Sequence, residues 1–568
     1  MGNREFAALL YEAADLMELQ GIDWKPQAYR KAARAIESLE RDISDILKQS
    51  GRKELQEIPG VGEGIASHIE EFLRSGRVKK FDEVRKSLPP GIGELLELEG
   101  LGPKKAALLL KKLRVRGLAD LKKALGAGKL RSLEGFGEKS EENLRKALEL
   151  HERGKERMLL GEALPLAEEL LDYLRPHAER LDYAGSLRRM QETIGDIDIL
   201  AQSGRPSGVM EAFIAFPRVE RVLAHGATKS SVLLREGIQV DLRVIPAGSY
   251  GAALQYFTGS KEHNVALRAI AAKRGLRLSE YGLFKGEKLL AGRSEEEVYR
   301  KLGFPLIPAE MREDRGELAG TKPPELVELR DMRGDLHAHT TFSDGISAVE
   351  EMALAAKSKG YEYLAITDHS QAERIARGLS EERLEEQWKE LSRVEKRVGI
   401  RLLRGAEISI QNDGSLDYPE RVLKKLEVTV CSIHSGFKMP KEKMTERILA
   451  ALDNKYCDIL GHPTGRLLNR RAPYEADMQR VFEEAVEERK ILEVDGHPER
   501  LDLCDAHALA ARKLGAKFSL STDSHAAAHL GYMRFAVGQA RRGWLTKGDV
   551  VNTLHLKGLR KVFPRMRD

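Results

Sequence analysis

The sequence predicts a multidomain α/β protein with a helical N-terminal region, a central α/β segment and a C-terminal barrel of alternating strands and helices. In residues 1–85 apolar residues recur at helical intervals, as in "REFAALLYEAADLMELQG". From about residue 160 the pattern changes to the alternation of strands, as in "GIQVDLRVIP". Residues 334–568 repeat seven short apolar runs, each followed by a helix-like stretch, which is typical of a barrel related to the TIM type.

Composition narrows the class of protein. The 568 residues are 42% hydrophobic and 32% charged, which is typical of a globular protein with several cores. The net charge of +5 favours a polyanionic partner only weakly. The chain has no apolar run of about 18 residues and no signal-peptide pattern, so we expect a cytoplasmic monomer with no membrane partner. Cys431, Cys457 and Cys504 form no CxxC pair, which excludes a disulfide framework or a cysteine-bound zinc.

A short motif recurs three times near the N-terminus, as "IPGVGEGIA" (58–66), "LEGLGPKKA" (98–106) and "LEGFGEKSE" (133–141). Each copy has an apolar residue, a Gly-x-Gly turn and the start of a helix, so backbone N–H groups can face a phosphate. One copy alone would most often be a helix connection, but three copies with basic flanks are typical of helix-hairpin-helix motifs, which hold the nucleic-acid backbone without reading its sequence. We therefore expect two DNA-binding helical domains, 1–85 and 86–155. The residues expected at the DNA backbone are Gly60, Gly62, Gly100, Gly102, Lys104, Gly135 and Gly137.

Two carboxylates stand two positions apart in "IGDIDIL" (194–200), where strand spacing points Asp196 and Asp198 to one face and the isoleucines to the other. A third acid, Asp241, stands in a later strand-like run. The structural alternative is an exposed strand edge, on which the like charges would only repel each other. Three carboxylates on neighbouring strands can instead hold two divalent cations, which stabilise a phosphoryl displacement. The turn "GSLRR" (185–189) can offer N–H groups, a hydroxyl and an arginine to a triphosphate.

The series "GSLRR…GDIDIL…VDLR…YFTGSKEHN" resembles the nucleotidyltransferase core of family X DNA polymerases, the group that includes polymerase beta. The resemblance runs from residue 1 to about 315. It implies a palm at 156–255 and a nucleotide-selecting subdomain at 256–315. The charged stretch 316–333 has two prolines and no apolar period, and therefore predicts a linker.

The same resemblance implies roles for individual residues. Asp196, Asp198 and Asp241 would be catalytic and would carry Mg²⁺ or Mn²⁺, with Asp241 also near the primer 3′-hydroxyl. Deoxynucleoside triphosphates would be bound through Gly185, Ser186 and Arg189 at the phosphates, Tyr256, Phe257 and Gly259 at the sugar, and Asn264 at the minor-groove edge of the base, while Arg268 would contact the template strand.

The sequence departs from the family pattern at three positions. His68 stands where the lyase lysine would follow "GVGEGIAS", so removal of deoxyribose phosphate would need another amine such as Lys25 or Lys31. Gln239 stands where an arginine often precedes the third aspartate, which changes how that aspartate is held. Lys261 replaces an acid beside the nucleotide pocket.

A second set of polar residues lies in the C-terminal segment, which holds ten of the fifteen histidines. Nine residues fall at or just beyond the ends of apolar strands, where barrel active sites gather. A single strand-end histidine is usually structural, but nine such residues on six strands predict a metal cluster. Imidazole and carboxylate suit manganese, zinc or iron, and Glu407 could bridge two ions. The set is His337, His339, Asp344, His369, Glu407, His434, His462, Asp523 and His525.

The motifs HxH, TDH, GHP and DSH, with a strand-end Glu and a strand-end His, resemble the PHP phosphoesterase family over residues 334–568. The resemblance implies a distorted (β/α)7 barrel with a trinuclear site that hydrolyses phosphoesters. Some PHP units joined to polymerases have lost ligands and only stabilise, but here all nine positions are occupied. Arg466 and Arg470, after "GHPTG", could hold a DNA phosphate.

Together the two resemblances imply a repair polymerase that fills short gaps, with a metal-dependent 3′–5′ exonuclease. Its partners would be DNA with gaps or recessed 3′ ends and deoxynucleoside triphosphates. The alternative is a 3′-end-processing phosphoesterase whose polymerase core mainly docks DNA. A non-catalytic scaffold is disfavoured, because a scaffold needs none of these acids and histidines.

Overall fold

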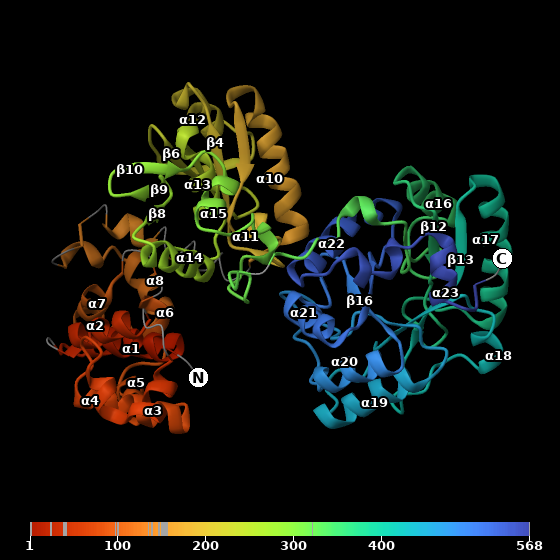
Figure 1. The fold of residues 1–568 in the computed structure, drawn as a ribbon, viewed down its shortest axis with the longest axis horizontal. Helices are drawn as coiled ribbons and strands as arrows, with labels where there is room; N and C mark the ends of the chain where they lie inside the picture. Colours follow the sequence, from red (N-terminus) through yellow and green to blue (C-terminus); the bar gives the residue numbers. More distant parts are fainter. Residues whose placement is uncertain are drawn as a thin grey trace. The chain divides into compact units, whose positions relative to one another are not determined.

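The computed structural model describes residues 3–22, 25–37, 42–96, 98, 101–133, 136–137, 140–145, 148, 157–320 and 322–566. The chain divides into two compact units, Met1–Lys155 and Glu156–Asp568. The first unit is helical where it is described, and the second contains the strands (Figure 1). No helix among the described residues is long and apolar enough to cross a membrane.

The first unit is built around two apolar cores. Helix α1 belongs to both, because Phe6 and Leu10 pack into one core while Leu16 and Leu19 pack into the other. The described helices are α1 (Asn3–Leu19), α2 (Lys25–Glu37), α3 (Ile43–Gln56), α4 (Glu63–Ser75), α5 (Lys79–Lys86), α6 (Ile92–Leu96), α7 (Pro103–Leu113) and α8 (Leu118–Gly126), with a 3-10 turn η1 (Leu130–Ser132). The predicted helical N-terminal region is confirmed.

The second unit begins with a five-stranded sheet of order β2-β4-β7-β6-β5, in which β4 and β7 are parallel and the other neighbours antiparallel. Ile197 and Ile199 are buried on the face that packs against α10 and α12, so the alternation in "IGDIDIL" has the predicted effect. The elements are β1 (Met158–Leu159), α10 (Leu160–Leu174), η2 (Arg175–His177), β2 (Arg180–Tyr183), α11 (Gly185–Arg188), β3 (Thr193–Ile194), β4 (Asp196–Gln202), α12 (Pro206–Ile214), β5 (Val219–His225), β6 (Lys229–Leu234) and β7 (Gln239–Val244).

A small subdomain follows, with a three-stranded sheet of order β10-β9-β8 and its own core. Its elements are η3 (Ala247–Ser249), α13 (Tyr250–Thr258), α14 (Lys261–Lys273), β8 (Arg277–Ser279), β9 (Gly282–Lys285), β10 (Lys288–Ala291), α15 (Glu295–Lys301) and η4 (Ala309–Met311).

The segment 316–333, which the sequence predicts to be a linker, is packed rather than free. Its one regular element is a 3-10 turn, η5 (Leu329–Asp331), in the part that the structure describes. Leu326 nevertheless joins the core of the preceding subdomain, and Val327 is fully buried in the core of the following barrel. The segment therefore fixes its two neighbours to each other.

The C-terminal part is a nearly closed barrel of seven parallel strands in sequence order. A parallel bridge between Ala338 and Ser524 brings its first and last strands together. The strands are β11 (Gly334–Asp335), β12 (Tyr363–Ile366), β13 (Arg401–Ser409), β14 (Val428–Ser432), β15 (Ile459–Leu460), β16 (Ile491–Asp495) and β17 (Lys517–Ser521). The predicted (β/α)7 architecture is confirmed.

Helices surround this barrel (Figure 1). They are α16 (Val349–Ser358), α17 (Glu381–Val398), α18 (Glu420–Leu423), α19 (Lys441–Asp453), α20 (Met478–Glu487), α21 (Asp505–Leu514), α22 (Met533–Arg542) and α23 (Leu556–Val562), with 3-10 turns η6 (Ala527–Tyr532), η7 (Lys547–Asp549) and η8 (Val551–Thr553). Helix α22 also contacts the five-stranded sheet's domain, because Gln539 donates a hydrogen bond to the carbonyl of Met190 at 2.8 Å.

Candidate active sites

The barrel brings all nine of its predicted ligands to the carboxyl end of its strands. His337, His339 and Asp344 follow β11, and His369 follows β12. Glu407 lies near the end of β13, and the remaining residues follow β14, β15 and β17. Because parallel strands end at the same rim, residues up to 188 positions apart become neighbours here.

Glu407 lies at the centre of the cluster. Its carboxylate is 2.8 Å from His369 Nδ1, 3.0 Å from His434 Nε2 and 2.8 Å from His462 Nε2. His337 Nε2 and His339 Nε2 lie 3.5 and 3.6 Å from Oε2, the oxygen that His369 also contacts. Five imidazoles thus surround one buried carboxylate, which is the arrangement expected of a bridging ligand.

Two further carboxylates complete the cluster. Asp523 Oδ1 is 3.1 Å from His339 Nε2, and Asp344 Oδ1 is 3.4 Å from His525 Nε2. The donor atoms form three overlapping groups that can each hold a metal ion: His339, Asp344, His369 and His525; His337, His339 and Asp523; and His369, Glu407 and His434.

The donor set fits metal ions. Three ring nitrogens, His337 Nε2 and both nitrogens of His339, are buried and make no hydrogen bond to any residue that the structure describes. Burial, and then the neighbouring imidazoles of His525 and His369, lower the pKa of His339 to about 3. A neutral imidazole has a free lone pair, which is the form that binds a metal.

Supporting contacts orient these imidazoles. Glu493, fully buried on β16, accepts from His337 Nδ1 at 2.8 Å and from the backbone N–H of His462. Ser409 Oγ lies 2.9 Å from His434 Nδ1. Such contacts fix the tautomer and the ring orientation of a ligand. The sequence prediction missed Glu493, although a charged residue inside the apolar run "ILEVDGH" was a signal that could have found it.

A second candidate site lies on the five-stranded sheet. Asp198 on β4 is the direct register partner of Asp241 on the parallel neighbour β7. Asp196 points to the same face two residues earlier and is the most solvent-accessible of the three. The three predicted carboxylates therefore come together, with oxygen atoms as their donors, and such a donor set suits Mg²⁺ or Mn²⁺.

The electrostatics of this group favour a cation. Burial, and then the charges of Asp196 and Asp241, raise the pKa of Asp198 to about 7. Burial and Asp241 also raise the pKa of Asp196. Neighbouring carboxylates raise one another's pKa values, and a bound divalent cation stabilises their charged forms.

Two neighbours adjust this group. Gln239 Nε2 donates to Asp241 Oδ1 at 2.9 Å, so glutamine does hold the third aspartate at the position where the family often has arginine. Gly185 begins α11 with a φ of +60°, and a Cβ there would lie 2.8 Å from Asp198 Oδ2. Glycine is therefore required beside the carboxylates both for its backbone conformation and for space.

The predicted triphosphate arginine is held by a buried network. Arg189 donates from Nη1 to the carbonyl of Thr258 and from Nε to Glu313 at 3.0 Å. Glu313 also accepts from Arg542 of α22 at 2.9 Å, and Arg542 is only 2% exposed. The guanidinium of Arg189 is thus fixed at two of its three nitrogens, and its acceptor Glu313 is held in turn by a residue of the barrel.

The predicted sugar and base contacts lie on α13 and α14. The rings of Tyr256 and Phe257 meet edge to face at 5.2 Å. Asn264 is held by hydrogen bonds from Gln255 and to the carbonyl of Tyr256, and Arg268 lies one turn further along α14. A Cβ at Gly259 would lie 3.3 Å from Arg189 Nη1, so Gly259 lies beside the triphosphate arginine.

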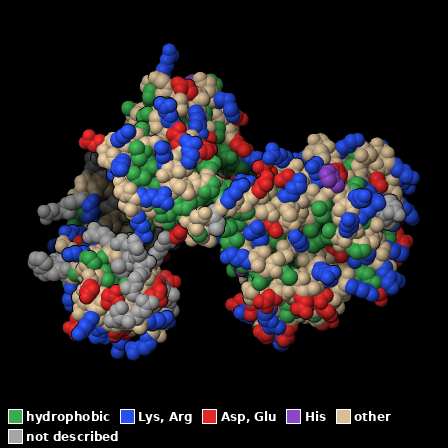
Figure 2. All heavy atoms as spheres, in the orientation of Figure 1, with side chains coloured by type: hydrophobic (Ala, Val, Ile, Leu, Met, Phe, Trp, Pro, Cys, Tyr) green, Lys and Arg blue, Asp and Glu red, His purple; other side chains and the backbone are tan. Residues whose placement is uncertain are grey.

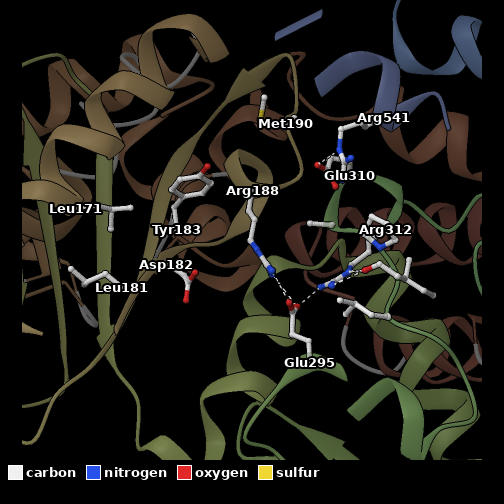
Figure 3. Close-up of a pocket in the computed structure, with 14 residues that line it drawn as sticks. Leu171, Leu181, Asp182, Tyr183, Arg188, Met190, Glu295, Glu310, Arg312 and Arg541 are labelled. Carbon is white, nitrogen blue, oxygen red and sulfur yellow. Dashed lines mark hydrogen bonds and ion pairs between the residues drawn. The ribbon is translucent and has the colours of Figure 1, made fainter. Parts of the chain in front are cut away.

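Neither candidate site coincides with the cavity in Figure 3, which has a volume of about 460 Å³. Glu295 forms ion pairs with Arg188 and Arg312 in its wall, each at 2.6 Å, and Glu310 pairs with Arg541 at 2.7 Å. The lining includes none of the three sheet carboxylates and none of the nine barrel residues. The cavity lies where the five-stranded sheet's domain, the small subdomain and helix α22 of the barrel meet, away from both candidate sites.

The helix-hairpin-helix residues are placed in part. Gly60 has a φ of +90°, and a Cβ there would lie 3.1 Å from the backbone of Ala32, so the first turn requires glycine. Gly62 and Gly102 cap the starts of α4 and α7 with extended backbone, and Lys104 follows in the first turn of α7. Gly137 accepts from the backbone N–H of Glu141 at 3.0 Å. Gly100 and Gly135 lie outside the described residues.

Comparisons with known proteins match each part of the chain. The descriptions that match are "Helix-hairpin-helix domain" at residues 1–78, "SAM-like Helix-hairpin-helix tandem" at 92–149, "DNA polymerase beta thumb" at 253–313 and "PHP domain" at 335–497. The DNA polymerase/3'-5' exonuclease PolX of Bacillus subtilis (strain 168) is 39% identical over 100% of both chains. The chain belongs to the family X DNA polymerases that carry a PHP domain.

Two other relatives each match only one part of the chain. The DNA polymerase lambda of Rattus norvegicus is 27% identical over 51% of this chain and 53% of its own length. A probable phosphatase of Thermoanaerobacter sp. (strain X514) is 30% identical over 39% of this chain and 89% of its own length. This family X chain therefore combines a polymerase part and a phosphatase-like part that also occur separately.

One predicted DNA contact of this family X chain has another role. The sequence left Arg466 either as a residue that could hold a DNA phosphate or as a solvated loop arginine, but its side chain is 10% exposed and pairs with Glu192 at 2.7 Å. Arg466 also donates to the carbonyl of Arg500. It therefore ties the barrel to the domain of the five-stranded sheet. Arg470 is 66% exposed and pairs with Glu499.

Proposed function

We propose that this chain fills short gaps in DNA by nucleotidyl transfer and trims 3′ ends with a metal-dependent 3′–5′ exonuclease. The observation that carries the proposal is the presence of two separate donor sets of different chemistry. One consists of three carboxylates on the five-stranded sheet, and the other of six imidazoles and three carboxylates in the barrel. Membership of a family whose Bacillus subtilis member is named for both activities supports it.

In the palm, Asp196, Asp198 and Asp241 would hold two Mg²⁺ or Mn²⁺ ions. When bound, these ions reduce the negative charge of the triphosphate and stabilise both the attacking and the leaving oxygen. Gln239 keeps the Asp241 carboxylate oriented toward its place beside the primer 3′-hydroxyl.

Residues around the palm would position the nucleotide. The turn at Gly185 and Ser186 would direct N–H groups and a hydroxyl at the phosphates, and Arg189 would present its Nη2 to them. Tyr256, Phe257 and Gly259 would contact the sugar, Asn264 the base, and Arg268 the template.

In the barrel, the nine predicted ligands would hold three ions of manganese, zinc or iron. The ions supply an activated water for attack on the terminal phosphodiester. Glu407 would bridge ions, and Glu493 would keep His337 in the ligating orientation.

DNA would be held by the hairpin motifs through Gly60, Gly62, Gly100, Gly102, Lys104, Gly135 and Gly137. Basic and acidic side chains are interspersed on the face shown in Figure 2. We further propose that the chain is a cytoplasmic monomer, with functional domains at 1–85, 86–155, 156–255, 256–315 and 334–568 joined by the segment 316–333.

A duplex with a one-nucleotide gap tests the proposal. With deoxynucleotides and Mn²⁺ or Mg²⁺ the protein should fill the gap, and without deoxynucleotides it should shorten the 3′ end. Asp196→Ala should abolish addition and retain hydrolysis, whereas His337→Ala should do the reverse. Hydrolysis without any gap filling by the wild type would instead favour a 3′-end-processing phosphoesterase whose palm only docks DNA.

A further inference from the structure

Two exposed isoleucines border the ligand cluster of the barrel. Of the large apolar side chains in the described ranges, Ile375 and Ile346 are the most exposed, at 99% and 78%. Ile346 lies in the loop after β11 and Ile375 in the loop after β12, so both lie at the carboxyl end of adjacent strands. Exposed apolar side chains beside a polar site mark a contact surface.

Ile346 is attached to the cluster through the backbone. Its N–H donates to the carbonyl of His525 at 2.7 Å, and His525 is a predicted ligand. The backbone N–H of Thr341 donates to Ser347 across the same loop, which closes it. The position of Ile346 at the rim is therefore fixed by the residues that form the site.

Ile375 lies at the tip of a second closed loop. Leu379 N–H donates to the carbonyl of His369, another predicted ligand, at 2.8 Å, and Gly378 N–H donates to Glu373 at 2.9 Å. The carboxylate of Glu373, two residues before Ile375, lies 3.9 Å from His434 Nδ1. The loop that carries Ile375 is therefore anchored at residues beside the cluster, and Ile375 itself is exposed.

One arginine joins the two loops. Arg383 of α17 donates to the carbonyl of Arg377 at 2.7 Å and to the carbonyl of Phe342. The exposed side chains of Arg374 and Arg377 flank Ile375. We call Ile346, Ile375, Arg374 and Arg377 the isoleucine rim.

We propose that the isoleucine rim binds the unpaired 3′-terminal nucleotides of a DNA strand, with bases against the isoleucines and phosphates beside the arginines. The proposal rests on the proposed exonuclease function and names the part of the substrate that lies outside its metal cluster. Isoleucine is one of the side chains that proteins insert against base steps, and arginines attract the phosphates. A terminal base pair must open before its phosphodiester can reach carboxylates as buried as Glu407, which is 1% exposed.

The test uses the full chain with Mn²⁺ and three substrates: bis(4-nitrophenyl) phosphate, a single-stranded oligonucleotide and the same strand with a paired 3′ end. The variants are Ile375→Ser, Ile346→Ser and the double variant. Leu514→Ser is the matched control, because Leu514 is 37% exposed and lies at the end of α21 that precedes β17, away from the ligand rim. Thermal melting of each variant checks folding.

The double variant should hydrolyse the small ester at the wild-type rate. Its kcat/KM on DNA should fall by about ten- to a hundredfold, with the larger loss on the paired 3′ end, because the free energy of burying an isoleucine side chain corresponds to this range. Ile375→Phe should retain DNA hydrolysis, and the Leu514 control should match the wild type on all three substrates.

Equal losses on DNA and on the small ester would show that the rim only supports the metal cluster and would overturn the proposal. Unchanged DNA hydrolysis would overturn it as well. If the double variant changes only the sedimentation of the protein, the surface is an interface between copies of the chain. A wild-type protein that cleaves the small ester but not DNA would remove the exonuclease function itself, an outcome that the variants cannot mimic.

Discussion

The two candidate sites each bring three carboxylates together, but in different electrostatic surroundings. The palm site brings together Asp196, Asp198 and Asp241, and the register pairing of Asp198 with Asp241 is close to the most repulsive arrangement that a sheet allows. The barrel site has three carboxylates too, but six imidazoles lie among them. The carboxylates of the palm therefore depend on bound cations for neutralisation, whereas the carboxylates of the barrel have imidazoles beside them.

The pKa directions express the same difference. Burial and neighbouring carboxylates raise the pKa of Asp198, whereas the surrounding imidazoles overcome burial and lower the pKa values of Glu407, Asp344 and Asp523. We therefore expect ions to exchange with the nucleotide at the first kind of site and to be retained at the second.

The largest expected effect separates the two sites by activity. Asp198→Asn removes a carboxylate that would contact both ions, so nucleotide addition on a gapped duplex should fall about a thousandfold or more. The exonuclease of the same preparation should be unchanged, because no barrel ligand is altered. Loss of both activities together would contradict the separation.

Next in size is the central ligand of the barrel. Glu407→Gln keeps the volume but removes the charge that five imidazoles surround, and hydrolysis of a 3′ end should fall at least about a hundredfold. Gap filling on the same DNA should remain, measured with deoxynucleotides in excess. A variant with intact hydrolysis would mean that this carboxylate bridges nothing.

Substitution of Glu493 tests whether the barrel ligands are oriented before a metal ion binds. Glu493→Gln should weaken metal retention about ten- to a hundredfold, because His337 loses its charged acceptor while every proposed ligand stays. Exonuclease activity measured against Mn²⁺ concentration should show a higher half-saturating concentration and a recovered maximum. A lower maximum with an unchanged half-saturating concentration would refute this role.

The raised pKa of Asp198 predicts a pH dependence of the palm alone. Below pH 7 the carboxyl group holds a proton that a cation must displace, so the half-saturating Mg²⁺ concentration for gap filling should rise about tenfold for each pH unit below 7 and level off above it. Assays at pH 6, 7 and 8 measure this. A flat profile would mean that Asp198 is ionised in the metal-free protein.

The smallest effect concerns the contact between the two parts. Arg542→Met removes the barrel residue that holds Glu313, and thereby Arg189, so KM for the nucleotide should rise about three- to tenfold with kcat nearly unchanged. Arg534→Met is the control, because Arg534 also joins the barrel to the palm, through Glu168 at 2.7 Å, but does not contact this network. Equal changes in both variants would indicate a general loss of docking.

The sequence predicted most of what depends on local pattern. The strand alternation in "IGDIDIL" placed Asp196 and Asp198 on one face, and the strand ends of the barrel placed nine ligands at one rim. On β4 the period of the strand fixes the direction of the side chains, and in the barrel the ends of parallel strands place the following residues at one rim.

What the sequence did not predict depends on distant partners. Arg466 was interpreted either as a DNA contact or as a solvated loop residue, and its observed partner, Glu192, lies 274 residues away in the chain. The strand of Glu493 shows an acid inside an apolar run, but it does not show that the acid's partner is His337, 156 residues away. The packing of Val327 in the barrel core was likewise invisible in a segment without an apolar period.

Metal retention tests the contrast between the sites most directly. The wild type, the triple variant Asp196→Asn, Asp198→Asn, Asp241→Asn and the variant Glu407→Gln are dialysed extensively without chelator, and the metal per chain is measured by elemental analysis. We predict that the triple variant retains as much metal as the wild type and that Glu407→Gln retains much less. If the triple variant loses metal while Glu407→Gln keeps it, the permanent ions belong to the palm and the account is wrong.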